Sequence, residues 1–272
     1  MNYPRINIIF RCCDAVNAVN KSPRPFDLDK KTLIKICFKS LLNSLQGFNY
    51  KLIVLGDNLS VEMKTFFQKH DLQLIEGVFG NDNSIRKSIE IALEQSANEW
   101  VYFCEDDYLH TQDFFLKIVT LIKEKQNIIP ASIKIKKLLR KRQITLFSFP
   151  RFFAKPNLVI FPCDYPDRYL IDYSEKNFIF KTSNSHWRQV SDTTFTFLIE
   201  TTEVKKHQRV LFKSANKAND RYLSKKLYGK SFFFNKLLCL SPIPTLSTHM
   251  HITTMSPLIN FEVLVNQLIN EV

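Results

Sequence analysis

Apolar and polar residues follow one another along the first half of the chain in a pattern that predicts repeated strand–helix units. Short apolar runs alternate with longer segments in which apolar residues recur every three to four positions, the period of an amphipathic helix. The runs that predict strands are 6–10, 52–55, 72–75 and 100–104, and the segments that predict helices are 30–45, 60–70, 83–97 and 111–126. Near-continuous apolar strands separated by helices are typical of a mostly parallel α/β sheet that is covered on both faces.

The second half has a less regular pattern. Residues 194–199 alternate as a strand does, and residues 203–214 and 219–228 read as helices. Ser256-Pro257 predicts the start of a final helix, because proline is favoured at the first helical position. Since neither an internal repeat nor a low-complexity linker interrupts the chain, we expect one domain over residues 1–272, with halves of about 1–126 and 127–272.

Composition excludes some classes of protein. The chain has only five glycines and contains neither GxGxxG nor GxxxxGK[ST], which argues against a dinucleotide-binding Rossmann site or a P-loop. None of its six cysteines forms a CxxC pair, and Cys12 and Cys13 are adjacent, so we expect free thiols and a cytoplasmic location. The N-terminus lacks a signal-peptide pattern, and no apolar run approaches 18 residues.

The formal net charge of +12 favours an anionic partner. Residues 133–142 contain six basic residues interleaved with isoleucines and leucines. This segment could be a basic amphipathic helix that lies on the inner face of an anionic membrane, or a plain solvated helix face.

Three adjacent carboxylates, Glu105, Asp106 and Asp107, directly follow the predicted strand 100–104. Adjacent carboxylates repel one another unless a cation neutralises them, and Mg²⁺ or Mn²⁺ takes oxygen ligands. The alternative is a solvated acidic turn. Arg11–Asp14 and Asp57 follow two other predicted strands, and ligands of parallel α/β sheets bind beyond the carboxyl ends of strands.

Together these motifs resemble the glycosyltransferases of the GT-A fold, nearest in style to the non-processive members of family 2. The motifs are the opening strand with the turn Arg11-Cys12-Cys13-Asp14, the strand end at Asp57, the segment Asn81–Arg86 of the type N-x-x-S-x-R, and Glu105-Asp106-Asp107. The resemblance covers about residues 5–125 and is weaker beyond. The Q-x-x-R-W motif of processive members is absent, and the Gly56-Asp57-Asn58 turn is less acidic and less glycine-rich than usual.

The resemblance implies a nucleotide-sugar donor at these strand ends. Asp107 would hold Mn²⁺ or Mg²⁺, and Glu105 and Asp106 would contact the ribose or orient water on the metal. Asp57 would lie at the base or ribose, and Arg11 and Arg86 would meet the diphosphate, whose oxygens match the guanidinium fork. Asp14 is placed with these donor-binding residues.

A late histidine is implied as a further metal ligand, because Thr248-His249-Met250-His251 resembles the histidine that some GT-A enzymes add. Side chains two apart on an extended segment face opposite ways, so we expect only one of the two histidines in the site and favour His249. Asn219-Asp220-Arg221 resembles the helix start that supplies the catalytic base, which makes Asp220 the candidate. A helix N-terminus lowers the pKa of a carboxyl group, so we expect Asp220 to be ionised. An N-cap is the alternative role, and Asp192 and Asp164 are alternative bases.

Acceptor binding is predicted for the loop 161–169, which is rich in Pro, Asp and Tyr, and for the later segment 186–188. Asp164 and Arg168 suit sugar hydroxyls, and Trp187 and Arg188 are placed with them. The alternative is a loop that is stiffened by proline and has a structural role. The resemblance implies transfer of a sugar, with inversion, to a glycan or lipid-linked acceptor in surface polysaccharide biosynthesis.

Two other functions remain open. A sugar-phosphate nucleotidyltransferase has a similar scaffold, but its glycine-rich N-terminal loop is missing because the first glycine is Gly47. A basic nucleic-acid-binding protein is supported only by the net charge and the basic cluster 134–142. Because the chain has no zinc-finger, RNP or basic-zipper motif, we expect no nucleic-acid partner.

Overall fold

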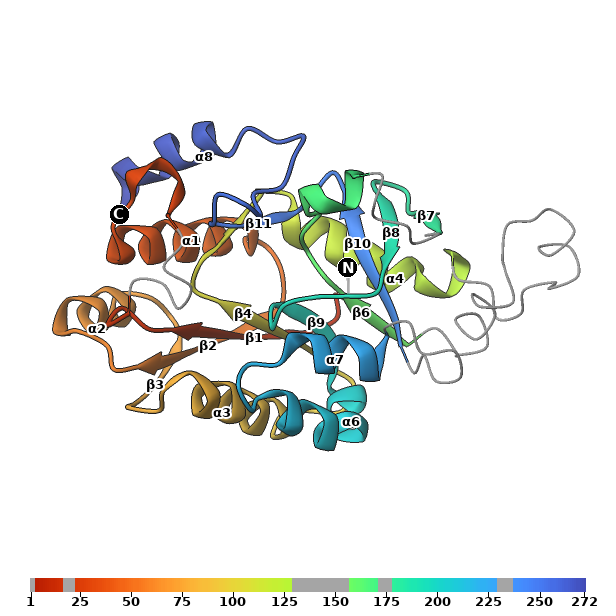
Figure 1. Ribbon diagram of the computed structural model, residues 1–272, viewed down its shortest axis with the longest axis horizontal. Helices are drawn as coiled ribbons and strands as arrows, with labels where there is room; N and C mark the ends of the chain where they lie inside the picture. The colour runs from red at the N-terminus through yellow and green to blue at the C-terminus, as the bar shows by residue number, and fades with distance from the viewer. Residues whose placement is uncertain (1–2, 17–22, 129–156, 171–177, 229–236) are drawn as a thin grey trace, which may run out of the picture.

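In the computed structural model the described residues are 3–16, 23–128, 157–170, 178–228 and 237–272. They form a nine-stranded sheet with helices on both faces, and a separate two-stranded ribbon (Figure 1). The predicted α/β class is confirmed.

The elements lie in the chain as follows. The strands of the large sheet are β1 (Ile6–Cys12), β2 (Tyr50–Asp57), β3 (Gln73–Gly77), β4 (Trp100–Glu105), β6 (Leu158–Ile160), β7 (Ile179–Lys181), β8 (His186–Val190), β9 (Phe197–Glu200) and β10 (Leu238–Ile243), and the ribbon consists of β5 (Tyr108–His110) and β11 (Ser247–His249). The helices are α1 (Lys30–Ser44), α2 (Val61–Gln68), α3 (Asn81–Leu93), α4 (Phe114–Ile128), α6 (Thr201–Ser214), α7 (Asp220–Leu227) and α8 (Phe261–Leu268), with short 3₁₀ turns η1 (Pro25–Asp27), η3 (Pro166–Tyr169) and η4 (Ile269–Glu271).

The large sheet has the strand order β3-β2-β1-β4-β9-β6-β10-β8-β7. Its first four strands are parallel, as the strand–helix pattern predicts. The strands of the second half continue the sheet from β4, and among the described strands β8 and β9 run opposite to the other seven. The sheet is therefore mostly parallel, and both halves of the chain share it.

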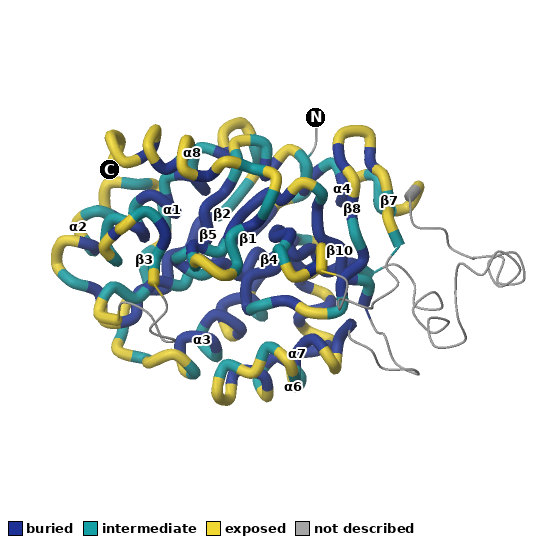
Figure 2. Tube along the Cα trace, turned by 45° about the horizontal axis from the view of Figure 1, so that its top comes forward, coloured by how far each residue is buried: buried dark blue, intermediate teal, exposed yellow. Residues whose placement is uncertain are grey.

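Two helical layers cover the sheet. Helices α1, α4 and α8 lie on one face, and α3, α6 and α7 lie on the other (Figure 1). The central strands β1, β4, β9 and β6 are almost wholly buried, whereas the edge strands β3 and β7 and the outer sides of α6 and α8 are partly exposed (Figure 2). Phe38 packs edge-on against Phe10 and Phe67, with ring centroids 5.3 and 5.0 Å away, which anchors α1 and α2 to β1. Apolar burial of this kind is the main driving force for the fold.

Some element boundaries differ from the predicted ones. The final helix begins at Phe261 rather than at 256–257, because the Asn260 side chain caps it by accepting from the Glu262 N–H at 3.1 Å. Helix α3 begins at Asn81, two residues early, after Gly80 with φ of 72°. Among the described residues, no helix has the length and apolar character needed to cross a bilayer.

Candidate active site

The carboxyl ends of three parallel strands meet at one cavity. Arg11 of β1 lies opposite both Leu55 of β2 and Glu105 of β4, so the three strands end at the same level. A cavity of about 610 Å³ opens at this edge. Seven residues predicted from the sequence line it: Arg11, Asp57, Glu105, Asp106, Asp107, Asp220 and His249.

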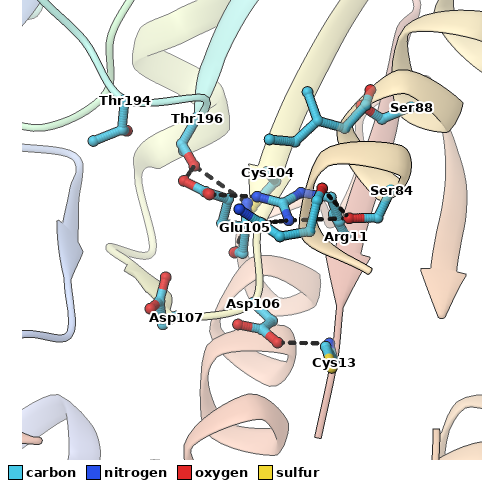
Figure 3. A network of polar contacts seen from close by, with 12 residues as sticks. Arg11, Cys13, Ser84, Ser88, Cys104, Glu105, Asp106, Asp107, Thr194 and Thr196 are labelled. Atoms are coloured by element: carbon cyan, nitrogen blue, oxygen red, sulfur yellow. Dashed lines mark hydrogen bonds and ion pairs between the residues drawn. The ribbon is translucent and has the colours of Figure 1, made fainter. Parts of the chain in front are cut away.

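Arg11 is the centre of a polar network at the cavity wall (Figure 3). Its Nη2 atom lies 2.5 Å from Glu105 Oε1, and its Nη1 atom donates to Asn81 Oδ1 at 3.0 Å and to Ser84 Oγ at 3.3 Å. The Thr196 hydroxyl donates to Glu105 Oε2 at 3.0 Å. The network joins β1, β4 and α3, and it fixes both charged side chains at the cavity.

Asp106 is neutralised by a residue that the sequence analysis missed. Lys30, the first residue of α1, places its Nζ atom 2.7 Å from Asp106 Oδ1, and the Cys13 N–H donates to Asp106 Oδ2 at 2.9 Å. Burial alone would lower the pKa of Lys30, but Asp106 and Asp107 outweigh it and raise the pKa. Lys30 is therefore charged inside the site.

Asp107 is held by two side chains from distant parts of the chain. Its Oδ2 atom lies 2.9 Å from Arg24 Nη1 and 3.2 Å from His249 Nε2. The same Arg24 nitrogen donates to the carbonyl of Met250 at 3.1 Å. Burial opposes ionisation of Asp107, but His249, Lys30 and Arg24 prevail and hold its pKa well below the usual range.

Each of the three adjacent acids thus has its own cation. Glu105 pairs with Arg11, Asp106 with Lys30 and Asp107 with Arg24. The mutual repulsion expected from the sequence is relieved within the chain, so neutralising these acids does not by itself require a metal. The case for a metal depends on the geometry of Asp107 and His249.

Asp107 and His249 supply a carboxylate and an imidazole, two ligand types that bind divalent metal ions. Among the described residues, no group of three or more His, Cys, Asp or Glu side chains is arranged to hold a metal. The 3.2 Å between Asp107 Oδ2 and His249 Nε2 matches the spacing of two neighbouring ligands that each lie about 2.1 Å from one ion. The other ligands would be phosphate oxygens and water, which is the usual coordination of Mg²⁺ in proteins.

Both His249 and His251 line the cavity, so the prediction that only one of them faces it is wrong. Strand β11 ends at His249 and the chain then turns, with the His251 N–H donating to the His249 carbonyl at 2.8 Å. The two rings are 5.5 Å apart and nearly parallel. The Asp107 carboxylate overcomes the effect of burial and raises the pKa of His249, whereas burial lowers the pKa of His251.

Asp220 is the first residue of α7 and lines the same cavity. The N-cap is its neighbour Asn219, whose side chain accepts from the Tyr222 N–H at 2.9 Å. Burial and the nearby charge of Glu105 raise the pKa of Asp220 to about 7. The expected lowering by the helix N-terminus is therefore wrong, because desolvation dominates.

Two predicted donor-binding acids hold backbone turns. Asp57 Oδ1 accepts from the Phe79 N–H at 2.6 Å and from the Gly80 N–H at 3.1 Å, which fixes the approach to α3 beside the cavity. Asp14 Oδ1 accepts from the Ser60 N–H at 3.0 Å and does not line the cavity. Asp14 thus joins the turn after β1 to the start of α2.

Arg86 lies away from the cavity lining. Its guanidinium donates to the side-chain oxygen of Asn216, in the turn between α6 and α7. This geometry favours a contact of Arg86 with the turn between α6 and α7 over the predicted contact with the diphosphate.

The predicted acceptor-binding residues Asp164, Arg168, Trp187 and Arg188 do not line this cavity, so their role in acceptor binding stays a prediction. Asp164 and Trp187 are fully buried, and the Trp187 indole N–H donates to Thr182 Oγ1 at 3.1 Å. Arg188 lies 3.5 Å from Asp164, and the Arg168 side chain lies 3.5 Å from Asp192. These charged side chains pair with one another, an arrangement that residue type alone does not reveal. The basic segment 133–142 lies outside the described residues.

Comparisons with known proteins give only distant similarities. No protein-family model and no curated protein sequence matches the chain. Among solved structures, the chain is similar to the galactosyltransferase LgtC in complex with donor and acceptor sugar analogues (10% identity, TM-score 0.38, covering 79% of this chain and 64% of that one). It is also similar to TarS from S. aureus (11% identity, TM-score 0.44, covering 87% of this chain and 57% of that one). A third similar structure is CMP:2-keto-3-deoxy-manno-octonic acid synthetase (9% identity, TM-score 0.42, covering 98% of this chain and 100% of that one).

The chain spans less than two thirds of the length of LgtC and of TarS. All three similarities have TM-scores below 0.5 and sequence identities of 9–11%. The activity therefore has to be inferred from the side chains of the cavity.

Proposed function

We propose that the chain is a metal-dependent glycosyltransferase that moves a sugar, with inversion, from a nucleoside-diphosphate sugar to a hydroxyl group of a glycan or lipid-linked acceptor. The observation that carries this proposal is the position of Asp220. Its carboxyl group, with a pKa of about 7, opens onto the same cavity as the Asp107–His249 pair. A group that accepts protons near neutral pH therefore shares one cavity with a site suited to a diphosphate.

In this proposal Asp220 acts as the general base. Its carboxylate takes the proton of the acceptor hydroxyl while that oxygen bonds to the anomeric carbon and the bond to the diphosphate breaks. General bases work best when their pKa lies near the operating pH, as that of Asp220 does. Asp57 and the turn that it fixes would form the wall against the base and ribose.

The diphosphate would bind at the opposite side of the acidic cluster. Asp107 and His249 would hold Mn²⁺ or Mg²⁺, which when bound neutralises negative charge on the departing diphosphate. Lys30 and Arg24 line this part of the cavity and are charge-complementary to phosphate oxygens. Arg11, held by Glu105, would add a third cation.

Asp220 also bears on the alternative, a sugar-phosphate nucleotidyltransferase. The attacking group in that reaction is a phosphate, which is already an anion at neutral pH and needs no general base. A sugar hydroxyl is neutral and benefits from one. A half-buried carboxyl group with a raised pKa therefore favours a hydroxyl acceptor.

A panel of nucleotide sugars separates the two activities. Purified protein is incubated with Mn²⁺ and each nucleotide sugar, and binding is followed by calorimetry and slow hydrolysis by release of nucleoside diphosphate. A parallel series supplies nucleoside triphosphates with sugar 1-phosphates and measures pyrophosphate. Release of nucleoside diphosphate from one donor class supports the proposal, whereas pyrophosphate release without it would overturn it.

We also propose that the acceptor belongs to a surface glycan and that residues 133–142 contact an anionic membrane. Each basic residue near such a surface contributes roughly 1 kcal/mol, so the six of this segment would localise the protein. Co-sedimentation with anionic vesicles should then decline as salt rises. Equal binding to neutral vesicles would contradict the membrane contact.

A further inference from the structure

We propose that Arg86 is a positioning residue that, together with Asn216, holds the turn before Asp220 against helix α3 and so fixes the catalytic base at the cavity. This inference rests on the proposed role of Asp220 as the base. It gives Arg86 a role different from the diphosphate contact that its sequence motif implies.

Two polar contacts join α3 to the turn between α6 and α7. The Arg86 guanidinium donates to the side-chain oxygen of Asn216. One turn earlier on the same face of α3, Asp82 Oδ2 accepts from the backbone N–H of Lys217 at 2.7 Å. The two contacts hold adjacent residues of the turn, one by its side chain and one by its backbone.

The turn has a backbone conformation that needs such support. Lys217 and Ala218 have φ of 58° and 41°, in the left-handed region that residues other than glycine rarely adopt. The Asn219 N–H then donates to the Ser214 carbonyl at 2.7 Å, and Asp220 begins α7. A small change of dihedral angles at these two residues would move the Asp220 carboxyl group relative to the cavity.

Helix α3 also lines the cavity itself, through Asn81 and Ser84. Asn81 and Ser84, at its start, accept hydrogen bonds from Arg11, which pairs with Glu105. The same helix therefore contacts the acidic cluster through its first turn and the base-carrying turn through Arg86. It sets the spacing between these two parts of the site.

Substitution of Arg86 and Asn216 separates positioning from donor binding, because neither residue lines the cavity. Arg86→Met keeps the apolar stem and removes the donors. We expect kcat at saturating donor to decline about 10- to 100-fold, as misplaced catalytic groups do, with the donor KM unchanged within about twofold. Asn216→Ala should act similarly, the double variant should be no worse than Arg86→Met, and Arg86→Lys should restore part of the rate.

Lys87→Met is the matched control, because Lys87 is the next residue of α3 and pairs only locally with Glu90. It should leave kcat unchanged. An Arg86→Met variant with normal kcat and a raised donor KM would overturn the proposal in favour of a donor contact. An unchanged kcat and KM would also overturn it.

A measurement without turnover distinguishes failure of this inference from failure of the proposed function. Hydrogen exchange of the amides of 215–220 should be faster in Arg86→Met than in Lys87→Met, and NMR titration should show the pKa of Asp220 moving toward its ordinary value. Unchanged exchange would contradict the inference even if Asp220 is the base. If exchange is faster in Arg86→Met but the Asp220→Asn variant remains fully active, Arg86 does hold the turn. The role of Asp220 as general base is then refuted.

Discussion

The Nε2 atom of His249 lies 3.2 Å from Oδ2 of Asp107, although 142 positions separate the two residues in the chain. The ribbon β5–β11 produces this proximity, because it pairs His249 with Tyr108, the residue after Asp107. The Tyr108 and His249 rings also stack with centroids 4.9 Å apart, and the Met250 N–H donates to the Asp107 carbonyl at 2.8 Å. Backbone pairing therefore sets the spacing of the proposed metal ligands.

Asp107→Asn should remove metal-dependent nucleotide binding while the fold is kept. The neutral amide is a weaker ligand for a hard cation than a carboxylate. Calorimetry with nucleoside diphosphate and Mn²⁺ should show at least about a tenfold loss of affinity, or about 1.4 kcal/mol. Asp113→Asn is the control, since Asp113 pairs with Lys117 at 2.7 Å outside the cavity. An unchanged Mn²⁺ requirement in the Asp107 variant would refute the metal assignment.

His249→Ala and His251→Ala should differ in their effect on Mn²⁺. Only the imidazole of His249 lies beside Asp107, whereas His251 Nδ1 lies 2.9 Å from Thr253 Oγ1. Replacing His249 should weaken Mn²⁺ binding at least about tenfold, and replacing His251 should have a much smaller effect. Direct titration of Mn²⁺ followed by electron paramagnetic resonance measures both. The opposite order would make His251 the ligand.

Asp220→Asn should abolish most turnover and leave donor binding intact. The amide keeps the shape of the carboxyl group but accepts no proton, and a general base typically contributes about 10²–10⁴-fold to the rate. In the wild type, kcat/KM for the acceptor should rise about tenfold per pH unit below pH 7 and level off above it, because only the ionised carboxylate of Asp220 is active. Near-normal kcat in the variant would exclude this residue as the base.

The same substitution should change how stability depends on pH. The pKa of Asp220 is about 7 in the folded protein and about 3.8 without burial. Between these values the folded state keeps a proton that the unfolded state has released, so the stabilisation present at low pH is lost as pH rises to 7. For one such group, the free energy of unfolding changes by at most about 1.4 kcal/mol per pH unit. The Tm of Asp220→Asn relative to the wild type should rise from pH 4 to 7 and then stay constant, and a parallel pair of curves would contradict the raised pKa.

Asp57→Ala should destabilise the protein and weaken donor binding together. It leaves the N–H groups of Phe79 and Gly80 without their acceptor. Because Phe79 is half-buried and Gly80 is exposed, water can partly replace Asp57, and we expect a loss of about 1 kcal/mol, the lower end of the cost of an unpaired N–H. Asp57→Asn retains an acceptor oxygen and should cost less. Urea unfolding gives the stability, and steady-state kinetics should show a raised donor KM with kcat little changed. A large decrease in kcat at saturating donor would place Asp57 closer to the reacting atoms.

The sequence predicted the parallel half of the sheet and most of its acids. Strands β1, β2 and β4 are nearly continuous apolar runs, and polar residues at their carboxyl ends must lie at one edge of a parallel sheet. Asp57 and Glu105 could be placed for this reason, because their prediction did not depend on contacts between residues distant in the sequence.

Other features of the site depend on contacts that a pattern does not encode. Lys30 and Arg24 reach acids 76 and 83 positions away, and nothing in their local sequence marks them. Residue type also could not tell that Asp164 and Arg188 face each other in the interior. The pKa of Asp220 depends on burial by elements that are distant in the sequence.

The strand order also limits how the protein can be divided. Strand β4 pairs on one side with β1 and on the other with β9, which comes almost a hundred residues later. A recombinant fragment that ended after α4 would expose the apolar edge of β4 and lose β11, the partner of β5. Unpaired apolar edges promote aggregation. We therefore expect a fragment of residues 1–128 to require coexpression with the remainder of the chain.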